Sequence, residues 1–408
     1  MKSKKIVCKT NTKTLLSTTM SVAMATVFSS AVYAVEPTAI NLDNGLSVTP
    51  FLSTGYTYDN NIFSDATKTK SSGILTIAPS VNLLLDDGVN QYSADVTVTS
   101  GTFTSSSDDN FLNTELSGAV HLEPSSQSRF DLTGSANWLS EPRGTGITEG
   151  LGDSVSEPLT YAEQSLGVAY EYGALSSKAR VAFNVDYYNK GYTNFEDFTK
   201  FRDYDSVKLG STFYYSTGAA TDALFEVSVD KIDYIEAVAA DVNRDSNDYR
   251  ALAGLKWEAT ALTAGEVKVG YQEKDFDNAG REKFSGLSWD ASVQWQPLTY
   301  STFDFATSRS AKDPNVIGDY IKESLYSASW IHNWSQRLAS RLSTTYTNEE
   351  YSGIDRTDKT TTLSAAADYS LARWVDVSLF TDYTDKDSNQ SNIYFDKLIV
   401  GVNFTMSM

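Results

Sequence analysis

The sequence has few of the residue types that most often carry covalent or metal chemistry. It contains one cysteine, two histidines and eight prolines in 408 residues. Cys8 precedes an apolar stretch in a segment that we expect to be removed, so the mature chain can form no disulfide and no Cys-ligated metal site. No later stretch approaches the roughly 18 apolar residues that a membrane-spanning helix needs. The composition therefore excludes a disulfide-stabilised fold and a bundle of membrane helices.

Positive charge is also scarce. Lys and Arg number 33 against 52 Asp and Glu, which gives a formal net charge of -19. Nucleic acid is therefore not expected as a partner, because its phosphates would be repelled. By contrast, Phe, Trp and Tyr make up 12% of the residues. High aromatic content without membrane helices is typical of a transmembrane β-barrel, in which only alternate residues of each strand face lipid.

The N-terminal residues have the pattern of a secretory signal peptide. Several lysines and no acidic residue precede an apolar stretch at 15–28, which is followed by Ala31-Val-Tyr-Ala34. Small residues at these positions suit cleavage after Ala34. We predict a signal peptide at 1–34, a short periplasmic N-terminal segment at 35–47 and an outer-membrane β-barrel at 48–408. The mature protein is then expected in the outer membrane of a Gram-negative bacterium.

The end of the chain alternates between apolar and polar side chains. Leu398, Val400, Val402 and Phe404 fall on one face, and small or polar residues such as Asn403 fall on the other. This pattern predicts a β-strand with one apolar face, which also fits an edge strand of a soluble β-sandwich. The strand resembles the terminal assembly signal of bacterial outer-membrane barrels, although the chain ends in Met rather than in an aromatic residue. That resemblance implies barrel-assembly machinery and outer-membrane lipid as partners.

Segments with the same period of two recur along the whole mature chain. We predict about eighteen strands, with boundaries uncertain by a few residues: 48–58, 72–85, 91–103, 111–123, 129–140, 161–173, 178–192, 203–216, 222–234, 247–259, 265–276, 284–296, 301–310, 322–335, 337–348, 359–371, 374–384 and 393–408. Short and long connections alternate between them, which is typical of outer-membrane barrels. The predicted fold is all-β, a transmembrane antiparallel up-and-down β-barrel with short periplasmic turns and longer extracellular loops.

Aromatic residues gather at the ends of these segments. Trp138 and Tyr187 stand near one end of their strands, and Trp257, Trp295 and Phe404 stand near the opposite end. Two such belts are expected where lipid headgroups begin. A soluble sandwich would instead bury its aromatic residues in the middle of the strands. The aromatic pattern therefore favours the barrel.

The other face of each strand is predicted to line a lumen. Charged residues on this face are Asp95, Glu115, Arg129, Asp131, Glu163, Glu171, Lys178, Arg180, Asp186, Lys208, Glu226, Asp230, Arg250, Lys256, Glu266, Lys268, Asp290, Asp304, Arg341, Asp368, Asp376 and Asp382. Fourteen of them are acidic and eight are basic. Eighteen strands leave a water-filled channel unless something fills it. The glycine-rich loop 141–160 can either fold inward and narrow this channel or move freely outside the cell.

The sequence offers no arrangement of catalytic residues. His121 shares a predicted face with Glu115, a pairing that would suit a general base and the group that orients it. Its place near the predicted periplasmic end favours an ordinary hydrogen-bonding histidine. Asp59, Asn60 and Asn61, together with Asp65, can supply oxygen ligands to a divalent cation, but they lack the spacing of a known calcium loop. We therefore predict no enzyme activity, no cofactor and no metal site.

One motif resembles a known family. Gly55-Tyr-Thr-Tyr-Asp-Asn-Asn-Ile-Phe63, followed by Ile77-Ala-Pro-Ser-Val81, resembles an outer-membrane β-barrel porin family associated with exopolysaccharide and capsule biosynthesis operons. The residues that carry the motif are Tyr58, Asp59, Asn60 and Asn61. The resemblance implies a role in export or assembly of an extracellular or capsular polysaccharide, and it implies no catalytic residue. In physical terms, Asp59, Asn60 and Asn61 can also satisfy their own backbone where the strand leads into a loop.

Three functions remain open at this point. The family resemblance favours a channel or accessory component for a polysaccharide, whose partners would be the polysaccharide and other secretion components. The mixed charge of the lumen favours a general diffusion porin for small solutes, and the long acidic loops favour a structural or adhesive surface barrel. A pore for a strongly acidic polymer should concentrate Arg and Lys, and this sequence does not. The polymer is then neutral or weakly acidic, or the protein assists secretion without conducting the chain.

Overall fold

The computed structural model describes residues 39–218, 220–237, 243–258 and 262–407. The predicted signal peptide, 1–34, lies outside these residues. Nearly all regular structure in the described part of the chain is β-strand. No helix of that part is both long enough and apolar enough to cross a membrane.

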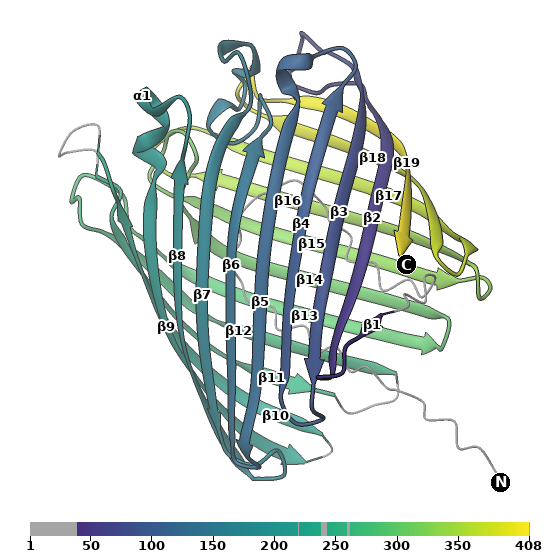
Figure 1. Cartoon of the computed structure of the whole chain (residues 1–408). Helices are drawn as coiled ribbons and strands as arrows, with labels where there is room; N and C mark the ends of the chain where they lie inside the picture. The colour runs from purple at the N-terminus through teal and green to yellow at the C-terminus, as the bar shows by residue number, and fades with distance from the viewer. Residues whose placement is uncertain (1–38, 219, 238–242, 259–261, 408) are drawn as a thin grey trace. The chain divides into compact units, whose positions relative to one another are not determined.

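Eighteen long antiparallel strands, β2 to β19, follow one another in the order of the sequence, and a two-residue strand, β1, precedes them (Figure 1). The strands are β1 Ile40–Asn41, β2 Leu46–Asp59, β3 Ser72–Asp86, β4 Gln91–Phe103, β5 Phe111–Ser125, β6 Ser128–Glu141, β7 Leu159–Tyr172, β8 Ala179–Tyr192, β9 Tyr204–Gly218, β10 Thr221–Tyr234, β11 Ser246–Trp257, β12 Thr263–Phe276, β13 Phe284–Leu298, β14 Ser301–Lys312, β15 Ile321–Asn333, β16 Leu338–Tyr351, β17 Thr357–Ala372, β18 Val375–Ser388 and β19 Phe395–Ser407.

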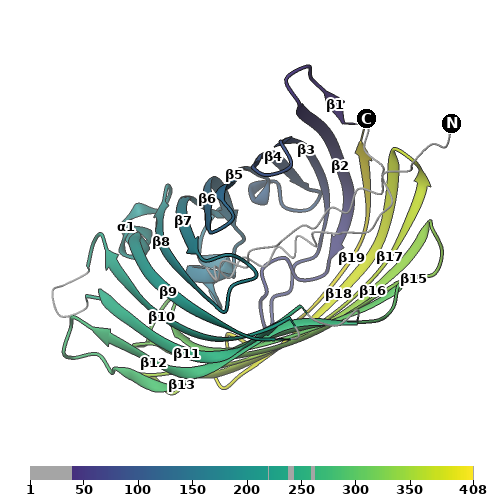
Figure 2. The ribbon, with the colours of Figure 1, turned by 90° about the horizontal axis from the view of Figure 1, so that it is seen from below.

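The sheet closes on itself because the last strand pairs with the first long one. Val402 of β19 lies opposite Tyr56 of β2, and the pairing continues to Ser407 opposite Phe51. Beyond that point β1 takes over, since Ile40 pairs with Val48. Figure 2 shows the strands following one another around the barrel. The predicted fold class and its eighteen strands are confirmed, and the predicted strand ends differ from the observed ones by a few residues.

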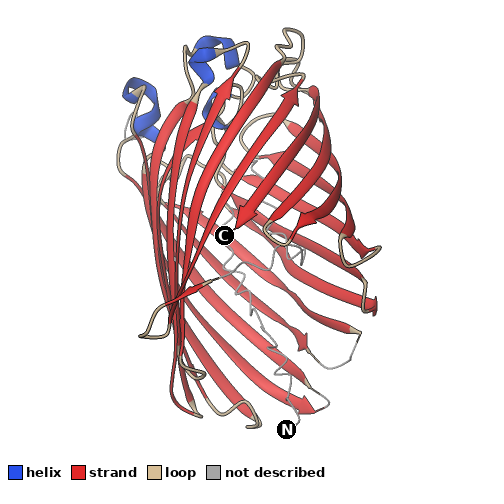
Figure 3. Cartoon of the chain, turned by 45° about the vertical axis from the view of Figure 1, so that its right-hand side comes forward, coloured by secondary structure: helices blue, strands red, loops and turns tan. Residues whose placement is uncertain are grey.

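The two ends of the barrel are different. Connections after odd-numbered long strands are short turns, such as 126–127 and 299–300, whereas connections after even-numbered strands include the long loops 60–71 and 142–158. The helical segments of the described residues all lie in these loops, at the upper end of the barrel in Figure 3. They are α1 Glu196–Thr199 and the 3-10 turns η1 Ser107–Asp109, η2 Gly146–Thr148, η3 Gly152–Ser154 and η4 Lys200–Arg202. In outer-membrane barrels the short turns are periplasmic and the long loops extracellular.

The alternation of side chains gives the barrel an apolar exterior. In β7, Leu166 and Val168 are 62% and 46% exposed, whereas the residues between and beside them point inward. Seven apolar residues near the middle of their strands share this outward parity: Val98, Leu116, Val168, Leu209, Val227, Val293 and Val377. An exterior of this kind is stable only in contact with lipid or detergent.

Aromatic side chains gather on the outer surface near the turn end. Trp295 and Phe303 stack at a centroid distance of 5.1 Å, and Phe303 lies 6.1 Å from Trp330. His332 comes two residues after Trp330 on the same outer face, and its ring centroid lies 4.4 Å from that of Trp334. The strand-end belt expected from the sequence is therefore present on this part of the wall, and His332 belongs to it.

The outward parity leads to a test of the membrane-facing surface. We expect Leu116→Arg to destabilise the barrel by roughly 2 to 4 kcal/mol, because it places a charge in the hydrocarbon layer. Ser117→Arg is the matched control and should cost little, since Ser117 points into the lumen opposite Asp95. Refolding titrations in lipid vesicles measure both values. Equal costs for the two variants would contradict the assignment of the faces.

Candidate functional site

The wall of the lumen carries charges of both signs. All the charged residues predicted for this face lie on the inward parity of their strands, except Lys178, which precedes β8 in a turn. The predicted residues on this wall include Asp95, Glu115, Arg129, Asp131, Arg180, Lys208, Arg250, Lys256, Lys268, Asp290, Asp304, Arg341, Asp368 and Asp376. Acidic groups outnumber basic ones, so the wall has a negative balance.

Ion pairs connect neighbouring strands along this wall. Near the turn end, Glu171 accepts hydrogen bonds from Arg129 at 2.5 Å and from Arg180 at 3.0 Å, and Arg180 also pairs with Asp222. A similar arrangement, with one basic side chain between carboxylates, occurs on β10 and β12. Lys268 lies between Glu226 at 3.0 Å and Glu266 at 2.8 Å. Most basic groups of the wall are therefore neutralised by carboxylates close to them.

Loop 142–158, between β6 and β7, folds over the mouth of the barrel. Arg143 donates two hydrogen bonds to Asp109, at 2.7 and 2.6 Å, and its guanidinium lies 4.2 Å from the ring centroid of Phe63. The hydrogen bond to Asp109 raises the pKa of Arg143. Gly144 has φ +81°, and a Cβ there would lie 1.7 Å from the carbonyl oxygen of Phe63. Only glycine allows the loop to approach its neighbour so closely.

The same loop reaches a distant part of the barrel wall through Glu149. Its carboxylate pairs with Arg356 at 2.6 Å and with Lys386 of β18. Five strands, β2 to β5 and β19, separate β6 from β18 along the sheet. Burial alone would lower the pKa of Arg356, but its hydrogen bond to Asp358 and the charge of Glu149 raise it. Of the two arrangements considered for this loop, the inward one is observed.

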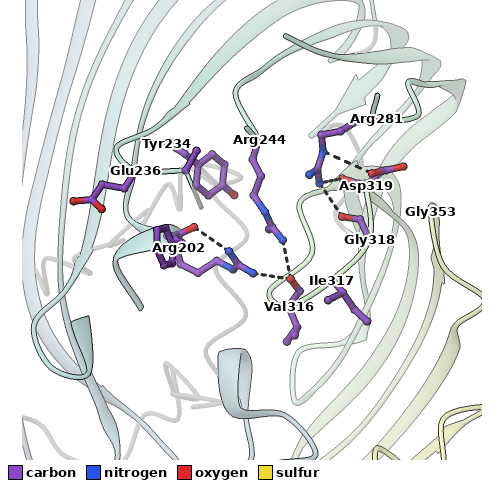
Figure 4. Close-up of a pocket in the computed structure, with 12 residues that line it drawn as sticks. Arg202, Tyr234, Glu236, Arg244, Arg281, Val316, Ile317, Gly318, Asp319 and Gly353 are labelled. Carbon is purple, nitrogen blue, oxygen red and sulfur yellow. Dashed lines mark hydrogen bonds and ion pairs between the residues drawn. The ribbon is translucent and has the colours of Figure 1, made fainter. Parts of the chain in front are cut away.

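Loop 313–320, between β14 and β15, covers another part of the mouth and is held by arginines of three other loops (Figure 4). Arg202 donates to the carbonyl oxygens of Asn315 and Val316, both at 2.6 Å. Arg244 donates to Pro314 at 2.6 Å and to Val316 at 2.8 Å. Arg281 donates to Gly318 at 2.8 Å and Asp319 at 3.1 Å. Three guanidinium groups therefore surround one short segment of backbone.

A buried ion pair holds the start of this loop from the lumen side. The ammonium group of Lys274, a residue that is 1% exposed, lies 3.1 Å from Asp313. The hydroxyl of Tyr234 donates to the other oxygen of Asp313 at 3.3 Å. Since separating a buried ion pair leaves an uncompensated charge, this contact strongly favours the folded position of the loop.

Tyrosines form a row on the inner wall next to these loops. The rings of Tyr188 and Tyr204 lie 5.6 Å apart, and those of Tyr204 and Tyr234 lie 5.5 Å apart. Tyr188 also donates to Glu163 at 2.8 Å. Tyr161 and Tyr192 are more buried, in a cluster that loop 142–158 covers with Ile147. The row crosses β8, β9 and β10 and ends at Tyr234, which lines a cavity together with Arg202, Arg244 and Arg281.

The motif residues have a structural role at the seam of the barrel. Tyr58 points outward, and Asp59 pairs with Lys397 of β19 at 2.8 Å. Asn60 accepts from the amide of Leu398 at 2.7 Å, and Asn61, which is fully buried, donates to the carbonyl oxygen of Asp396 at 3.1 Å. Asn61 N also donates to Asp59 at 2.8 Å. These side chains satisfy the backbone at the strand-to-loop exit, as predicted, and they also join the first and last long strands.

The groups considered for catalysis or metal binding have other partners. His121 lies 2.6 Å from Asp131 and 3.2 Å from Glu123, near the turn end, so its observed partners differ from Glu115. The carboxylate of Asp65 accepts from the amides of Lys68 and Thr67, which lower its pKa. Among the residues that the structure describes, no group of three His, Cys, Asp or Glu side chains could hold a metal ion.

The sequence reasoning missed the three arginines of loops 193–203, 235–245 and 277–283, as well as Lys274. A signal was present, because three successive long loops each place an arginine close to the following strand. The pairing of Glu149 with Lys386 left no such signal, since 237 positions separate these residues.

A closed barrel with an apolar belt, a charged lumen and inward-folded loops has the architecture of an outer-membrane porin. The chain belongs to the family described as Putative beta-barrel porin 2, whose model matches residues 46–408. It is therefore a porin-type outer-membrane β-barrel. A comparison with curated protein sequences found no match.

Several solved structures are similar to the barrel. A BenF-like porin from Pseudomonas fluorescens Pf-5 has 10% sequence identity and a TM-score of 0.48, and the match covers 90% of this chain and 100% of that one. OccAB4 from Acinetobacter baumannii has 13% identity and a TM-score of 0.47, with 90% and 100% covered. OccK5 (OpdH) from Pseudomonas aeruginosa has 13% identity and a TM-score of 0.46, with 88% and 98% covered.

The contacts of Glu149 lead to a test of the loop that crosses the mouth. Glu149→Gln should weaken the anchoring of loop 142–158 by roughly 3 kcal/mol, because it removes one partner of a mostly buried ion-pair network. We expect a larger single-channel conductance in planar bilayers. Glu157→Gln is the matched control, as Glu157 is an exposed residue of the same loop. If both variants conduct like the wild type, loop 142–158 does not limit the pore.

Proposed function

We propose that this protein is a loop-constricted outer-membrane channel for saccharide chains, acting in export or assembly of an extracellular or capsular polysaccharide. The observation that carries the proposal is the combination of two inward-anchored loops with a row of lumen-facing tyrosines on a charged, polar wall. The resemblance of the motif at 55–63 to a family associated with polysaccharide operons points in the same direction.

The chemistry of the wall suits sugars. Aromatic rings stack on the apolar faces of pyranose rings, and carboxylates accept hydrogen bonds from sugar hydroxyls. Tyr188 and Tyr204 supply such rings, and Glu163 stands beside them. Because acidic groups predominate along the lumen, a neutral or weakly acidic chain fits better than a strongly acidic polymer. Secretion components and the polysaccharide itself are the partners that this function requires.

The mixed charge of the lumen supports a second candidate, a general diffusion porin for small solutes. Such a porin admits solutes by size and shows no saturable interaction with sugars. A structural or adhesive barrel has less support, because loops 142–158 and 313–320 are anchored over the lumen. A catalytic role has no support from the contacts of His121 or His332, which are those of a salt-bridged wall residue and an aromatic belt.

Block of the ion current by sugars distinguishes the two channel functions. We expect neutral oligosaccharides to occlude the current reversibly in planar bilayers. Tyr188→Ala should weaken this block by roughly 2- to 10-fold, which corresponds to the loss of one aromatic contact. Tyr187→Ala is the matched control, because its ring lies on the outer surface. A current that no oligosaccharide blocks at millimolar concentration would favour the diffusion porin.

The charge of the lumen predicts its ion selectivity. We expect a weak preference for cations, because carboxylates outnumber basic groups on the wall. The preference should grow at low salt, where screening is weaker and the Debye length exceeds about 10 Å. Reversal potentials in a salt gradient measure it. Asp95→Asn combined with Asp290→Asn should reduce the preference, whereas Asp385→Asn, on the outward face of β18, should not. A marked anion preference would contradict the lumen assignment.

A further inference from the structure

Three arginines from three successive loops face one cavity at the mouth of the barrel. Arg202, Arg244 and Arg281 line a cavity of about 280 Å³, together with the ring of Tyr234 and the side chain of Ile317 (Figure 4). Small-molecule sites commonly measure about 300 to 1,000 Å³, so this cavity has room for a small ligand. Its wall combines guanidinium groups with aromatic and aliphatic surface.

The arginines of this cavity have few carboxylate partners. Among the described residues, the one carboxylate within 4.0 Å of any of them is Asp319, whose Oδ1 lies 3.8 Å from the Nε of Arg281. Glu236, which also lines the cavity, pairs with Lys200 at 3.2 Å. The arginines donate instead to neutral carbonyl oxygens, and Arg202 and Arg244 share the carbonyl of Val316. The cavity therefore keeps an excess of positive charge.

Arginines elsewhere in the same loop layer are neutralised differently. Arg143 lies against Asp109, and Arg356 lies against Asp358 and Glu149. Their pKa values are raised. In contrast, burial and the adjacent charge of Arg244 lower the pKa of Arg202 to about 10, and burial lowers the pKa of Arg281. The charges of Arg202 and Arg281 are thus destabilised by their surroundings, whereas those of Arg143 and Arg356 are stabilised.

Arg281 provides a second indication of a ligand. Its side chain is only 8% exposed, and its Nε makes no hydrogen bond within the part of the chain that the structure describes. A buried donor without a partner is unfavourable. Fastening loop 313–320 does not account for it, because amide or ammonium donors can bind carbonyl oxygens without placing three guanidinium charges together.

We propose that Arg202, Arg244 and Arg281 bind the carboxylate of a small organic acid. The planar guanidinium group matches a carboxylate with two parallel hydrogen bonds. Tyr234 and Ile317 then contact the organic body of the ligand. The same chemistry is offered by a hexuronic acid and by a short aliphatic acid. The site lies at the entrance of a lumen whose wall is otherwise acidic, so it is the place where an anionic ligand is stabilised.

Isothermal titration calorimetry on the full-length protein in detergent tests this proposal. The probes are glucuronate and succinate, with glucose as the uncharged comparison. We expect at least one of the two acids to bind the wild type, and Arg244→Gln to weaken that binding by roughly tenfold or more, the loss of a charged hydrogen-bonded contact. Arg337→Gln is the matched control, because Arg337 is exposed in the turn 334–337 at the other end of the barrel.

A second variant addresses folding. Arg281→Lys keeps the charge but lacks the planar fork, so we expect an intermediate loss of affinity, and heat-modifiable migration on gels verifies that each variant forms a barrel. Tighter binding of glucuronate identifies an acidic sugar as the ligand, and tighter binding of succinate identifies an aliphatic acid. The proposal is overturned if neither acid binds the wild type, or if Arg244→Gln and Arg337→Gln bind equally well. These results are independent of current block by neutral oligosaccharides.

Discussion

The requirement that every backbone amide and carbonyl in the membrane be paired governs this structure. Unpaired groups in hydrocarbon cost several kcal/mol each, so a sheet can cross a bilayer only when it is closed. Closure depends on the pairing of β19 with β2 from Ile399 opposite Asp59 to Ser407 opposite Phe51. The ion pair of Asp59 with Lys397 and the amide contacts of Asn60 and Asn61 strengthen that seam at its loop end. The motif that first suggested a family is therefore part of the closure.

Closure also fixes what the lumen contains. Since successive side chains of a strand point to opposite faces, a shift by one residue would exchange the lipid-facing and lumen-facing sets. The lumen must then accept whatever the inward positions carry, and here they carry many acids and fewer bases. Ion pairs such as Arg129 with Glu171 and Arg341 with Asp368 place the bases next to acids. The wall is polar enough to hold water and has no strong excess of positive charge.

Local patterns were enough to predict the strands, and non-local contacts were not predictable. The period of two and the turn residues act within a few positions, so the strand limits and the inward parity of residues such as Asp131 or Lys268 could be read from the sequence. The path of loop 142–158 depends on Glu149 meeting Arg356 and Lys386, residues more than 200 positions away. Likewise, His121 pairs with Asp131 because β5 and β6 lie side by side, whereas the sequence had suggested only Glu115 as a group that could orient it. The contacts of Glu149 depend on closure of the barrel, and that of His121 depends on the register between two neighbouring strands.

The two inward loops are held by different forces, and this difference has consequences for the pore. Loop 142–158 is held by carboxylate–cation contacts, in which each partner would be left with an uncompensated charge if the loop moved. Loop 313–320 is held partly by arginines on neutral carbonyls, and an arriving anion can replace a carbonyl oxygen as acceptor without leaving any charge unpaired. Because a charged acceptor makes a stronger hydrogen bond than a neutral one, this exchange is favourable for a suitable ligand. The ion pairs of loop 142–158 therefore oppose its displacement, whereas the ligand proposed for Arg202, Arg244 and Arg281 would compete with loop 313–320 for the same hydrogen-bond donors.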